Sequence, residues 1–214
     1  MTKLSPTERT RIHRGPARGN YDRDVIHSIL DEALVCHLAF VVDDQPYAIP
    51  TTFARIDDRL FVHGAAASRM IKTIASGVRV CFTVTILDGI VLARSAFNHS
   101  MNYRSVVVLG TADEVTDLAH KRRALDAIVD RAAESRSRSA RPPNDKELGA
   151  TRVFALAIEE ASAKIRTGGP IDDEEDLVLP IWAGHVPLAL RAGAPIPAEG
   201  LAHDLATPGL RHRR

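Results

Sequence analysis

The sequence predicts a mainly β fold, an antiparallel barrel with helical insertions. Three observations support this prediction: about six β-type apolar runs, short turn sequences such as Asp-Asp between them, and only two or three segments with helical spacing. We find no internal repeat of about 20–50 residues, so a solenoid or propeller is not expected. The 214 residues suffice for one domain with a substantial core.

The first half of the chain reads as one helix, three strands and a second helix. Residues 21–32 carry apolar side chains at helical spacing. Strand patterns with Asp-Asp turns between them follow over residues 34–42, 46–56 and 60–62. Pro50 inside the second strand predicts a sheet edge or a bulge, because proline cannot donate to a ladder. The next helix begins at Ser68, a favoured N-cap, and ends near Gly77, a suitable C-cap.

The second half continues with strands and one long helix. Strands are expected over residues 80–86, 90–94 and 103–115, with a Leu-Asp-Gly turn between the first two. A helix over residues 117–134 and a last clear strand over residues 152–158 flank a basic Ser/Pro-rich loop, which we expect to be mobile. The expected organisation is therefore an N-terminal mobile arm, one domain and an irregular tail, covering residues 1–20, 21–190 and 191–214.

Composition excludes several classes of function. The chain has 28 Lys and Arg against 27 Asp and Glu, so no global basic field favours nucleic acid. The longest apolar run, residues 33–42, is too short for a membrane span and is interrupted by His37. The polar N-terminus lacks the core of a signal peptide. Cys36 and Cys81 lie in apolar runs and read as buried thiols, so we expect a cytoplasmic protein.

Common catalytic motifs are absent. No G-x-G-x-x-G follows a strand, and no Walker loop, C-x-x-C, H-E-x-x-H or G-x-S-x-G occurs. The nine histidines do not cluster at ligand spacing, and the acidic residues 172–176 read as a solvated loop, so no metal site is expected. These absences argue against a Rossmann dehydrogenase, a P-loop enzyme, a common zinc site and a serine hydrolase.

The segment over residues 59–79 contains the strongest candidate site. A strand ends at His63 and Gly64, and the helix that follows carries Arg69 in its first turn and Lys72 one turn later. Cations are unfavourable at a helix N-terminus unless an anion such as phosphate binds there. An ordinary amphipathic helix is the alternative from the residues alone. Likewise, His63 reads either as a functional or as a hydrogen-bonded structural histidine, and Trp182 either as a packing residue or as a stacking surface for a planar ligand.

Three longer passages of the sequence resemble a known protein family. FVHGAAASRM, LDGIVLARSAFNHSMNYRSVVVLG and LPIWAG resemble the pyridoxamine 5′-phosphate oxidase-like flavin-binding split barrels, especially their flavin-nucleotide-binding subgroup. The resemblance covers residues 21–188. It implies a six-stranded antiparallel split β-barrel of Greek-key type that binds FMN. It also implies a homodimer with two equivalent sites across the interface, because both chains contribute to each site in this family.

The resemblance assigns the phosphate end of the cofactor. Ser68 and Arg69 match the family's Ser-Arg-Lys in kind and spacing, while Met70 replaces the lysine, so Lys72 is expected to supply the second charge. Arg104 is the next candidate for the phosphate. The residues expected along the flavin ring are Pro50, Thr51, Thr52, His63, Gly64, Ser105 and Trp182. Ser105 stands where the family has a glutamine, and Trp182 resembles the C-terminal tryptophan that the partner subunit places beside the flavin.

The expected function is that of an FMN-dependent oxidoreductase. The family's oxidases grip pyridoxal with an Arg-x-His segment, and residues 183–188 lack it, so pyridoxamine phosphate oxidation is not expected. Nitroimidazole-resistance reductases carry a histidine at the position of His63. We therefore expect electrons to pass from NAD(P)H through FMN to a small planar or nitroaromatic acceptor, with His63 as the catalytic residue. The alternatives are a haem-binding or haem-degrading barrel with His99 or His185 as ligand, a flavin carrier or sensor without turnover, and a deazaflavin-using reductase.

Overall fold

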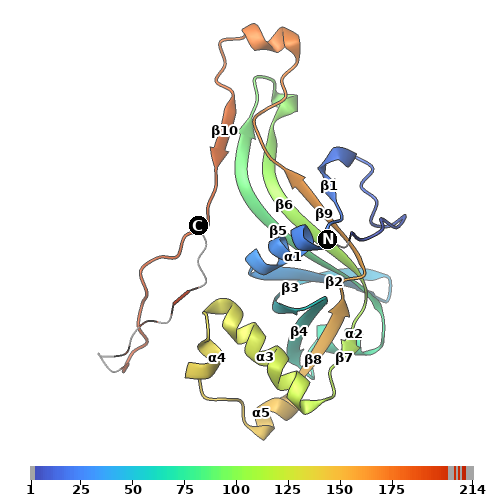
Figure 1. Cartoon of the computed structure of the whole chain (residues 1–214), viewed down its shortest axis with the longest axis vertical. Coiled ribbons are helices and arrows are strands. Elements are labelled where there is room, and N and C mark those ends of the chain that lie inside the picture. Colours follow the sequence, from blue (N-terminus) through green and yellow to red (C-terminus); the bar gives the residue numbers. More distant parts are fainter. Residues whose placement is uncertain (1–2, 202–204, 206, 208, 211–214) are drawn as a thin grey trace.

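The computed structural model describes residues 3–201, 205, 207, 209 and 210, and an antiparallel sheet dominates it (Figure 1). The strands are β1 (Gly19–Asn20), β2 (Val35–Val42), β3 (Gln45–Ile56), β4 (Arg59–Ala65), β5 (Arg79–Leu92), β6 (Ser100–Thr111), β7 (Asp113–Glu114), β8 (Thr151–Ala157), β9 (Glu160–Arg166) and β10 (Gly184–Pro187). The helices are α1 (Arg23–Glu32), α2 (Arg69–Ala75), α3 (Leu118–Ala132), α4 (Arg136–Ser139) and α5 (Asp145–Ala150). Short 3-10 turns are η1 (Pro16–Arg18), η2 (Ala96–Asn98) and η3 (Glu174–Val178).

The strand order confirms the predicted mainly β, antiparallel fold class. The sheet runs β1-β9-β6-β5-β2-β3-β4-β8-β7, and β10 pairs with β5. Within the described residues the sheet has ten strands where about six were expected, and pairing does not close it into a barrel. β9 was missed because its sequence, EASAKIR, is rich in residues with low strand propensity. Its conformation comes from pairing with β6, from Tyr103–Arg166 to Leu109–Glu160.

Two apolar clusters lie on opposite sides of the sheet. The larger one fills the curl of the sheet with α1 and α2, and its fully buried side chains include Phe53, Phe82 and Phe154. The smaller one lies where α3 packs on the outside of β4 and β8, around Phe61 and Val153. The sheet is therefore covered on both sides where α3 packs against β4, β8 and the C-terminal end of β3, but on one side only across β2, β5 and residues 45–52 of β3.

Local sequence signals set several of these elements. Ser68 caps α2 by accepting a hydrogen bond from the Ile71 N–H at 3.3 Å, and Gly77 follows the helix with a positive φ of 77°, as predicted. The β2–β3 hairpin turns at Asp43 and Asp44, both with positive φ (48° and 62°), as a two-residue type I′ loop requires.

Pro50 lies at a local sheet edge, as its sequence context predicted. Residues 45–52 of β3 pair with β2 only, and the pairing with β4 begins at Phe53. On the other side of these residues no strand follows within the described chain. Proline is tolerated there because no ladder hydrogen bond is lost.

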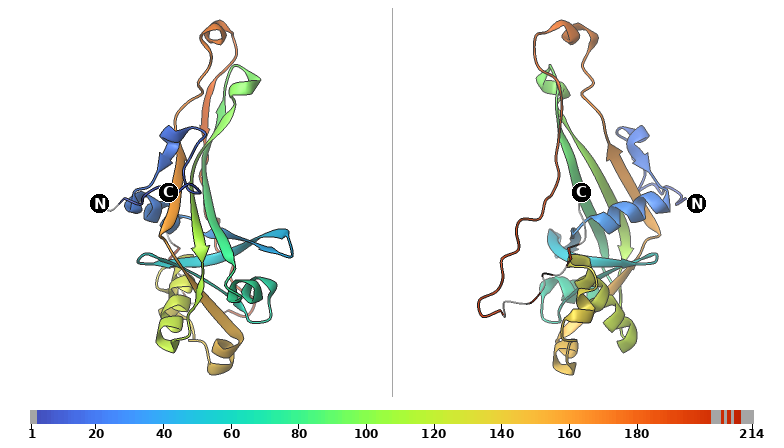
Figure 2. Two further views of the ribbon diagram at one scale, coloured as in Figure 1. Left: turned by 90° about the vertical axis from the view of Figure 1, so that its right-hand side faces the viewer. Right: turned by 60° about the vertical axis from the view of Figure 1, so that its left-hand side comes forward.

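The Leu-Asp-Gly segment is not a turn, which corrects the sequence expectation. β5 runs without interruption from Arg79 to Leu92, and a β-bulge between Leu87 and Gly89 shifts its register against β6. With β10, the distal halves of β5 and β6 form an arm that projects from the body and carries η2 and η3 at its tip (Figures 1 and 2). Asp172, from the acidic run expected to be solvated, is buried there in an ion pair with Arg94 at 2.7 Å.

The sequence predicted a mobile arm over residues 1–20. The described part of this segment, residues 3–20, packs against the sheet. Leu4 is buried in the core, β1 pairs with β9, and Arg9 bonds to Glu160. The basic loop over residues 136–145 contains the short helix α4. None of the helices in the described ranges has both the length and the apolar character needed to span a membrane.

Candidate functional site

Four of the seven predicted ring-contacting residues, Pro50, Thr52, His63 and Ser105, lie on one face of the sheet. Partners in an antiparallel ladder share a face, and neighbours along a strand alternate. Phe53 and Val62 are paired and both belong to the inner core, so Thr52 and His63 beside them face outward. By the same rule Pro50, opposite His37 in β2, also faces outward.

Ser105 lies on the same outer face, two strands away. The register joins His37 of β2 to Thr83 of β5, and Thr85 of β5 to Ser105 of β6. The Ser105 hydroxyl donates to the Lys164 carbonyl at 3.3 Å. The side of β2, β3, β5 and β6 away from the larger apolar cluster, together with His63 at the end of β4, is here called the outer face. It carries Pro50, Thr52, His63 and Ser105. Thr51 points the other way, so only its backbone is available to the outer face.

His63 is a half-buried histidine at the end of β4. Its Nδ1 atom is buried without a hydrogen-bond partner among the described residues. Burial lowers the pKa of its imidazole from the ordinary 6.5, because desolvation disfavours the charged form. Burial therefore favours the neutral form of the His63 imidazole, whose Nδ1 is unpartnered among the described residues.

Gly64, the next residue, sets how closely α2 approaches the strand. A Cβ atom on Gly64 would lie 2.9 Å from Cγ1 of Ile71, a buried residue of α2. Glycine is therefore required for the close packing of α2 against β4. The structure thus accounts for the glycine of the His63-Gly64 pair.

The three residues predicted to bind phosphate have different surroundings. Ser68 caps the helix, and Arg69 lies over the ring of Tyr47 with its Cζ 4.7 Å from the ring centre. Lys72 is exposed and belongs to the last turn of this seven-residue helix, where the helix dipole favours a cation. Arg69 and the Ser68 cap therefore remain as the unusual features of this helix end, and the assignment of phosphate to it stays a prediction.

Arg104 is held by two carboxylates. Its guanidinium bonds to Asp88 at 2.9 and 2.7 Å and to both oxygens of Glu32. These bonds raise the pKa of Arg104, first through Asp88 and then through Glu32. Arg104 thus joins the bulge of β5 to the end of α1, and a phosphate would have to compete with both carboxylates for it.

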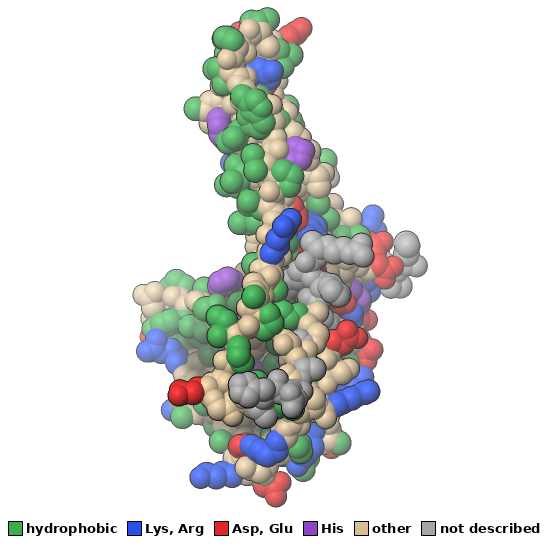
Figure 3. Space-filling view, turned by 90° about the vertical axis from the view of Figure 1, so that its left-hand side faces the viewer, with side chains coloured by type: hydrophobic (Ala, Val, Ile, Leu, Met, Phe, Trp, Pro, Cys, Tyr) green, Lys and Arg blue, Asp and Glu red, His purple; other side chains and the backbone are tan. Residues whose placement is uncertain are grey.

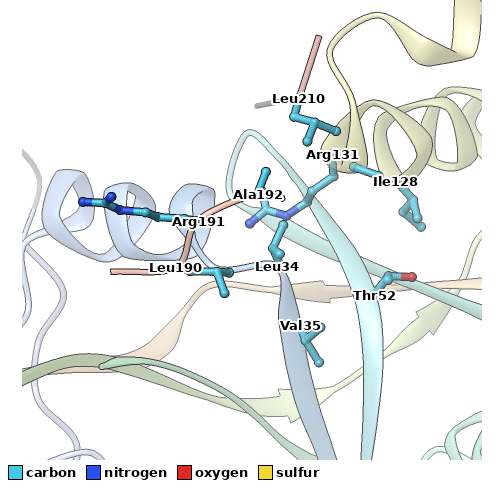
Figure 4. A pocket seen from close by; sticks show the side chains of 10 residues that line it. Leu34, Val35, Thr52, Ile128, Arg131, Leu190, Arg191, Ala192 and Leu210 are labelled. Atoms are coloured by element: carbon cyan, nitrogen blue, oxygen red, sulfur yellow. The ribbon is translucent and has the colours of Figure 1, made fainter. Parts of the chain in front are cut away.

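Two adjoining pockets open next to the outer face. The first, about 640 Å³, is here called the arginine pocket (Figure 4). It is lined by Leu34, Val35, Thr52, Ile128, Arg131, Ala132, Leu190, Arg191, Ala192 and Leu210. The second, about 590 Å³, is here called the histidine pocket. It is lined by Glu32, Ala33, Leu34, Val35, His37, Thr85, Ile86, Leu87, Asp88, Arg104, Leu188, Ala189 and Leu190.

The two pockets form one groove, because Leu34, Val35 and Leu190 line both. The segment after β10 forms one wall of the groove, and Figure 4 shows Leu190 to Ala192 crossing beside Leu34 and the Arg131 side chain from α3. Arg131 donates to the carbonyls of Leu30 and Ala33 at the end of α1, so it also fixes that helix.

Trp182 lies on the arm immediately before β10 and is 65% exposed in the single chain. Its ring packs over Gly184, where a Cβ would come within 3.0 Å of it. His185, on β10, and His99, after η2, also lie on the arm and line neither pocket. The residues predicted for the site therefore divide between the outer face, helix α2 and the arm.

Sequence reasoning missed the groove and His37. The signal was present, since His37 interrupts the longest apolar run and stands at an outward position of an alternating strand. The other walls come from residues 86–88 and 188–192, which only the bulge in β5 and the course of the tail bring together.

This open antiparallel sheet, with one face exposed beside a strand-end helix and a groove, is the architecture of the split-barrel proteins. The chain belongs to the pyridoxamine 5′-phosphate oxidase family, whose model matches residues 22–165. No curated protein matches the sequence.

Two solved structures resemble nearly the whole chain. The flavocytochrome Anf3 from Azotobacter vinelandii is 38% identical over 96% of this chain and 95% of its own, with a TM-score of 0.90. The FAD and haem binding protein from Mycobacterium smegmatis is 37% identical over 89% of this chain and 94% of its own, with a TM-score of 0.85. A Bacteroides thetaiotaomicron protein named for 5-nitroimidazole antibiotic resistance shares the fold at 21% identity, over 69% of this chain and 86% of its own, with a TM-score of 0.59.

Proposed function

We propose that this protein is an electron-transfer flavoprotein that binds a flavin nucleotide and haem. The observation that carries the proposal is the outer face, which carries Pro50, Thr52, His63 and Ser105 and adjoins a groove of cofactor size at Thr52. The nearly full-length similarity to a flavocytochrome and to an FAD and haem binding protein supports both cofactors.

The described residues fit a flavin on the outer face. A flavin ring has a flat apolar surface and polar edges, so it suits strand residues with hydroxyls and an imidazole. The buried Nδ1 of His63 lacks a partner, and an edge atom of the ring supplies one. In this proposal the phosphate lies at Ser68, Arg69 and Lys72, while Arg104 and Gly64 hold the surrounding elements in place.

The chemical identity of the flavin and the reaction that it carries out are also part of the proposal. FMN was expected from the sequence, whereas the relatives favour FAD, and a deazaflavin would occupy the same face. NAD(P)H is the proposed electron donor and a small planar molecule, including a nitroaromatic, the proposed acceptor. His63 would bind the acceptor or supply its proton, with the flavin carrying the redox chemistry.

We also propose that the protein acts as a homodimer. Val35, Val41 and Leu87 are 45%, 53% and 53% exposed. Such exposed apolar side chains also gather along the arm in the space-filling view (Figure 3). Exposed apolar surface of this extent marks an association surface. Trp182 would then reach the flavin of the partner subunit. A sedimentation mass of one subunit at micromolar concentration would refute the dimer.

The absorption spectrum of the purified protein tests the proposal. Flavin bands in the visible region together with a Soret band are expected, and chromatography of the released flavin distinguishes FMN, FAD and deazaflavin. Anaerobic addition of NADH or NADPH should bleach the flavin and then shift the haem bands. Flavin that is never bleached by either nucleotide would remove NAD(P)H as the donor. Reduction without turnover of any acceptor would favour a carrier or sensor.

A further inference from the structure

The histidine pocket presents one imidazole within apolar walls. Ala33, Leu34, Val35, Ile86, Leu87, Leu188 and Leu190 supply most of its lining. His37 is exposed on the outer face of β2, and its ring makes no hydrogen bond or ion pair with another described residue. An imidazole free to coordinate, beside an apolar slot, is the combination that holds a haem iron.

Charge is distributed unevenly along the groove. In the histidine pocket the carboxylates of Glu32 and Asp88 are both bonded to Arg104. The arginine pocket contains Arg131 and Arg191, and none of its lining residues is acidic. A ligand with an apolar body and carboxylates at one end therefore finds complementary surroundings when its body lies near His37 and its carboxylates point to the arginines.

We infer that His37 would coordinate the iron of a bound haem, with the macrocycle in the histidine pocket and the propionates toward the arginine pocket. The inference rests on the haem binding proposed above. Since His37 is the ladder partner of Pro50, the iron would lie next to the part of the outer face assigned to the flavin. Neighbouring cofactors are what electron transfer between them requires.

The other histidines in the described ranges are less suited to the groove. They are His13, His27, His63, His99, His120 and His185. None of them lines either pocket. His27 lies 3.0 Å from the carboxylate of Asp58, and His120 packs against the ring of Phe61. His99 and His185, the two candidates from the sequence, lie on the arm outside the groove.

Haem titration of the purified full-length protein tests the assignment, with the Soret band and the resonance Raman iron–imidazole mode as readouts. His37→Ala should lower haem affinity by more than about tenfold and remove the iron–imidazole mode. His37→Gly with added imidazole should restore the spectrum, which a purely structural role would not allow. His99→Ala and His185→Ala are matched controls and should bind haem like the wild type. Flavin content, measured in each variant, reports whether the outer face is intact.

The outcomes separate the inference from the proposed function. A wild-type protein that leaves the Soret band of added haem at the position of free haem would overturn both. Wild-type haem binding that survives unchanged in His37→Ala, or that is lost only in His63→Ala, His99→Ala or His185→Ala, would overturn the His37 assignment while leaving haem binding in place. Loss of the mode in His37→Ala with imidazole rescue and full flavin content would support it.

Discussion

Replacing Gly64 by alanine should destabilise the protein by moving α2 off the sheet. The added Cβ would lie 2.9 Å from Cγ1 and 3.3 Å from Cδ1 of Ile71. The first distance is short of the roughly 3.5 Å carbon contact by about 0.6 Å. Because Ile71 is fully buried and the contacted atom is near its backbone, the helix has to shift. Overpacking of this kind costs about 1–3 kcal/mol, from which about 0.5–1 kcal/mol is recovered by removing a flexible glycine.

The expected net loss in the free energy of unfolding is therefore about 0.5–2 kcal/mol. Urea denaturation measures it, with an unchanged slope showing that the two-state transition is preserved. Gly149→Ala is a matched control of opposite sign. Gly149 lies in α5, no atom comes within 4 Å of a Cβ built there, and the substitution should stabilise by up to about 1 kcal/mol.

A double-mutant cycle identifies the cause. In an Ile71→Ala background the clash is gone, so Gly64→Ala should become neutral or stabilising. The shift of α2 should also weaken flavin binding in Gly64→Ala but not in Gly149→Ala. A Gly64→Ala protein as stable as the wild type, or a cycle without coupling, would refute the packing argument.

Three further predictions follow from ionisable groups. Because burial lowers the pKa of His63, the unfolded protein binds more protons between that lowered pKa and about pH 6.5, so stability should fall with decreasing pH across this window by at most ~1.4 kcal/mol per unit. His63→Gln should flatten this slope in pH-dependent urea melts, and an equal slope in both proteins would contradict the prediction. Asp172→Asn removes the buried partner of Arg94 and should speed proteolysis at the arm tip, whereas exposed Glu175→Gln should not; equal rates would count against the ion pair as the tether. Burial raises the pKa of the Cys36 thiol to about 12, so mass spectrometry should detect its alkylation only on unfolding, and labelling of the native protein would show the site to be open.

The sequence was sufficient for the elements whose local signals agree with their surroundings. Ser68, Asp117 and the type I′ turn at Asp43 and Asp44 act within a few residues, so the helix starts and the first hairpin were predictable. The Leu-Asp-Gly segment was misread because the same residues fit a turn or a bulge. Pairing with β6 on one side and β10 on the other keeps β5 extended through Asp88.

The candidate site was predictable only in part, because local sequence signals determine some of its residues and long-range contacts determine the others. Strand alternation is local, and the outward direction of Pro50, Thr52 and His63 follows from it. The groove depends on the tail, where Leu188 and Leu190 have no period that would reveal their position. The contacts of Arg104 with Asp88 and Glu32 could also not be predicted without the fold, because 72 residues separate Arg104 from Glu32.

The Asp43–Asp44 turn has a consequence for how this molecule avoids aggregation. A two-residue hairpin makes Val42 and Gln45 a hydrogen-bonded pair, so the even-numbered residues of β3 direct their N–H positions away from β2, toward the open edge. Two of these positions, Pro46 and Pro50, have no N–H at all. An incoming strand would therefore find a template with donors missing at every second outward position, and edge-to-edge addition is blocked. The open edge of β3 is therefore protected against pairing with strands of other molecules.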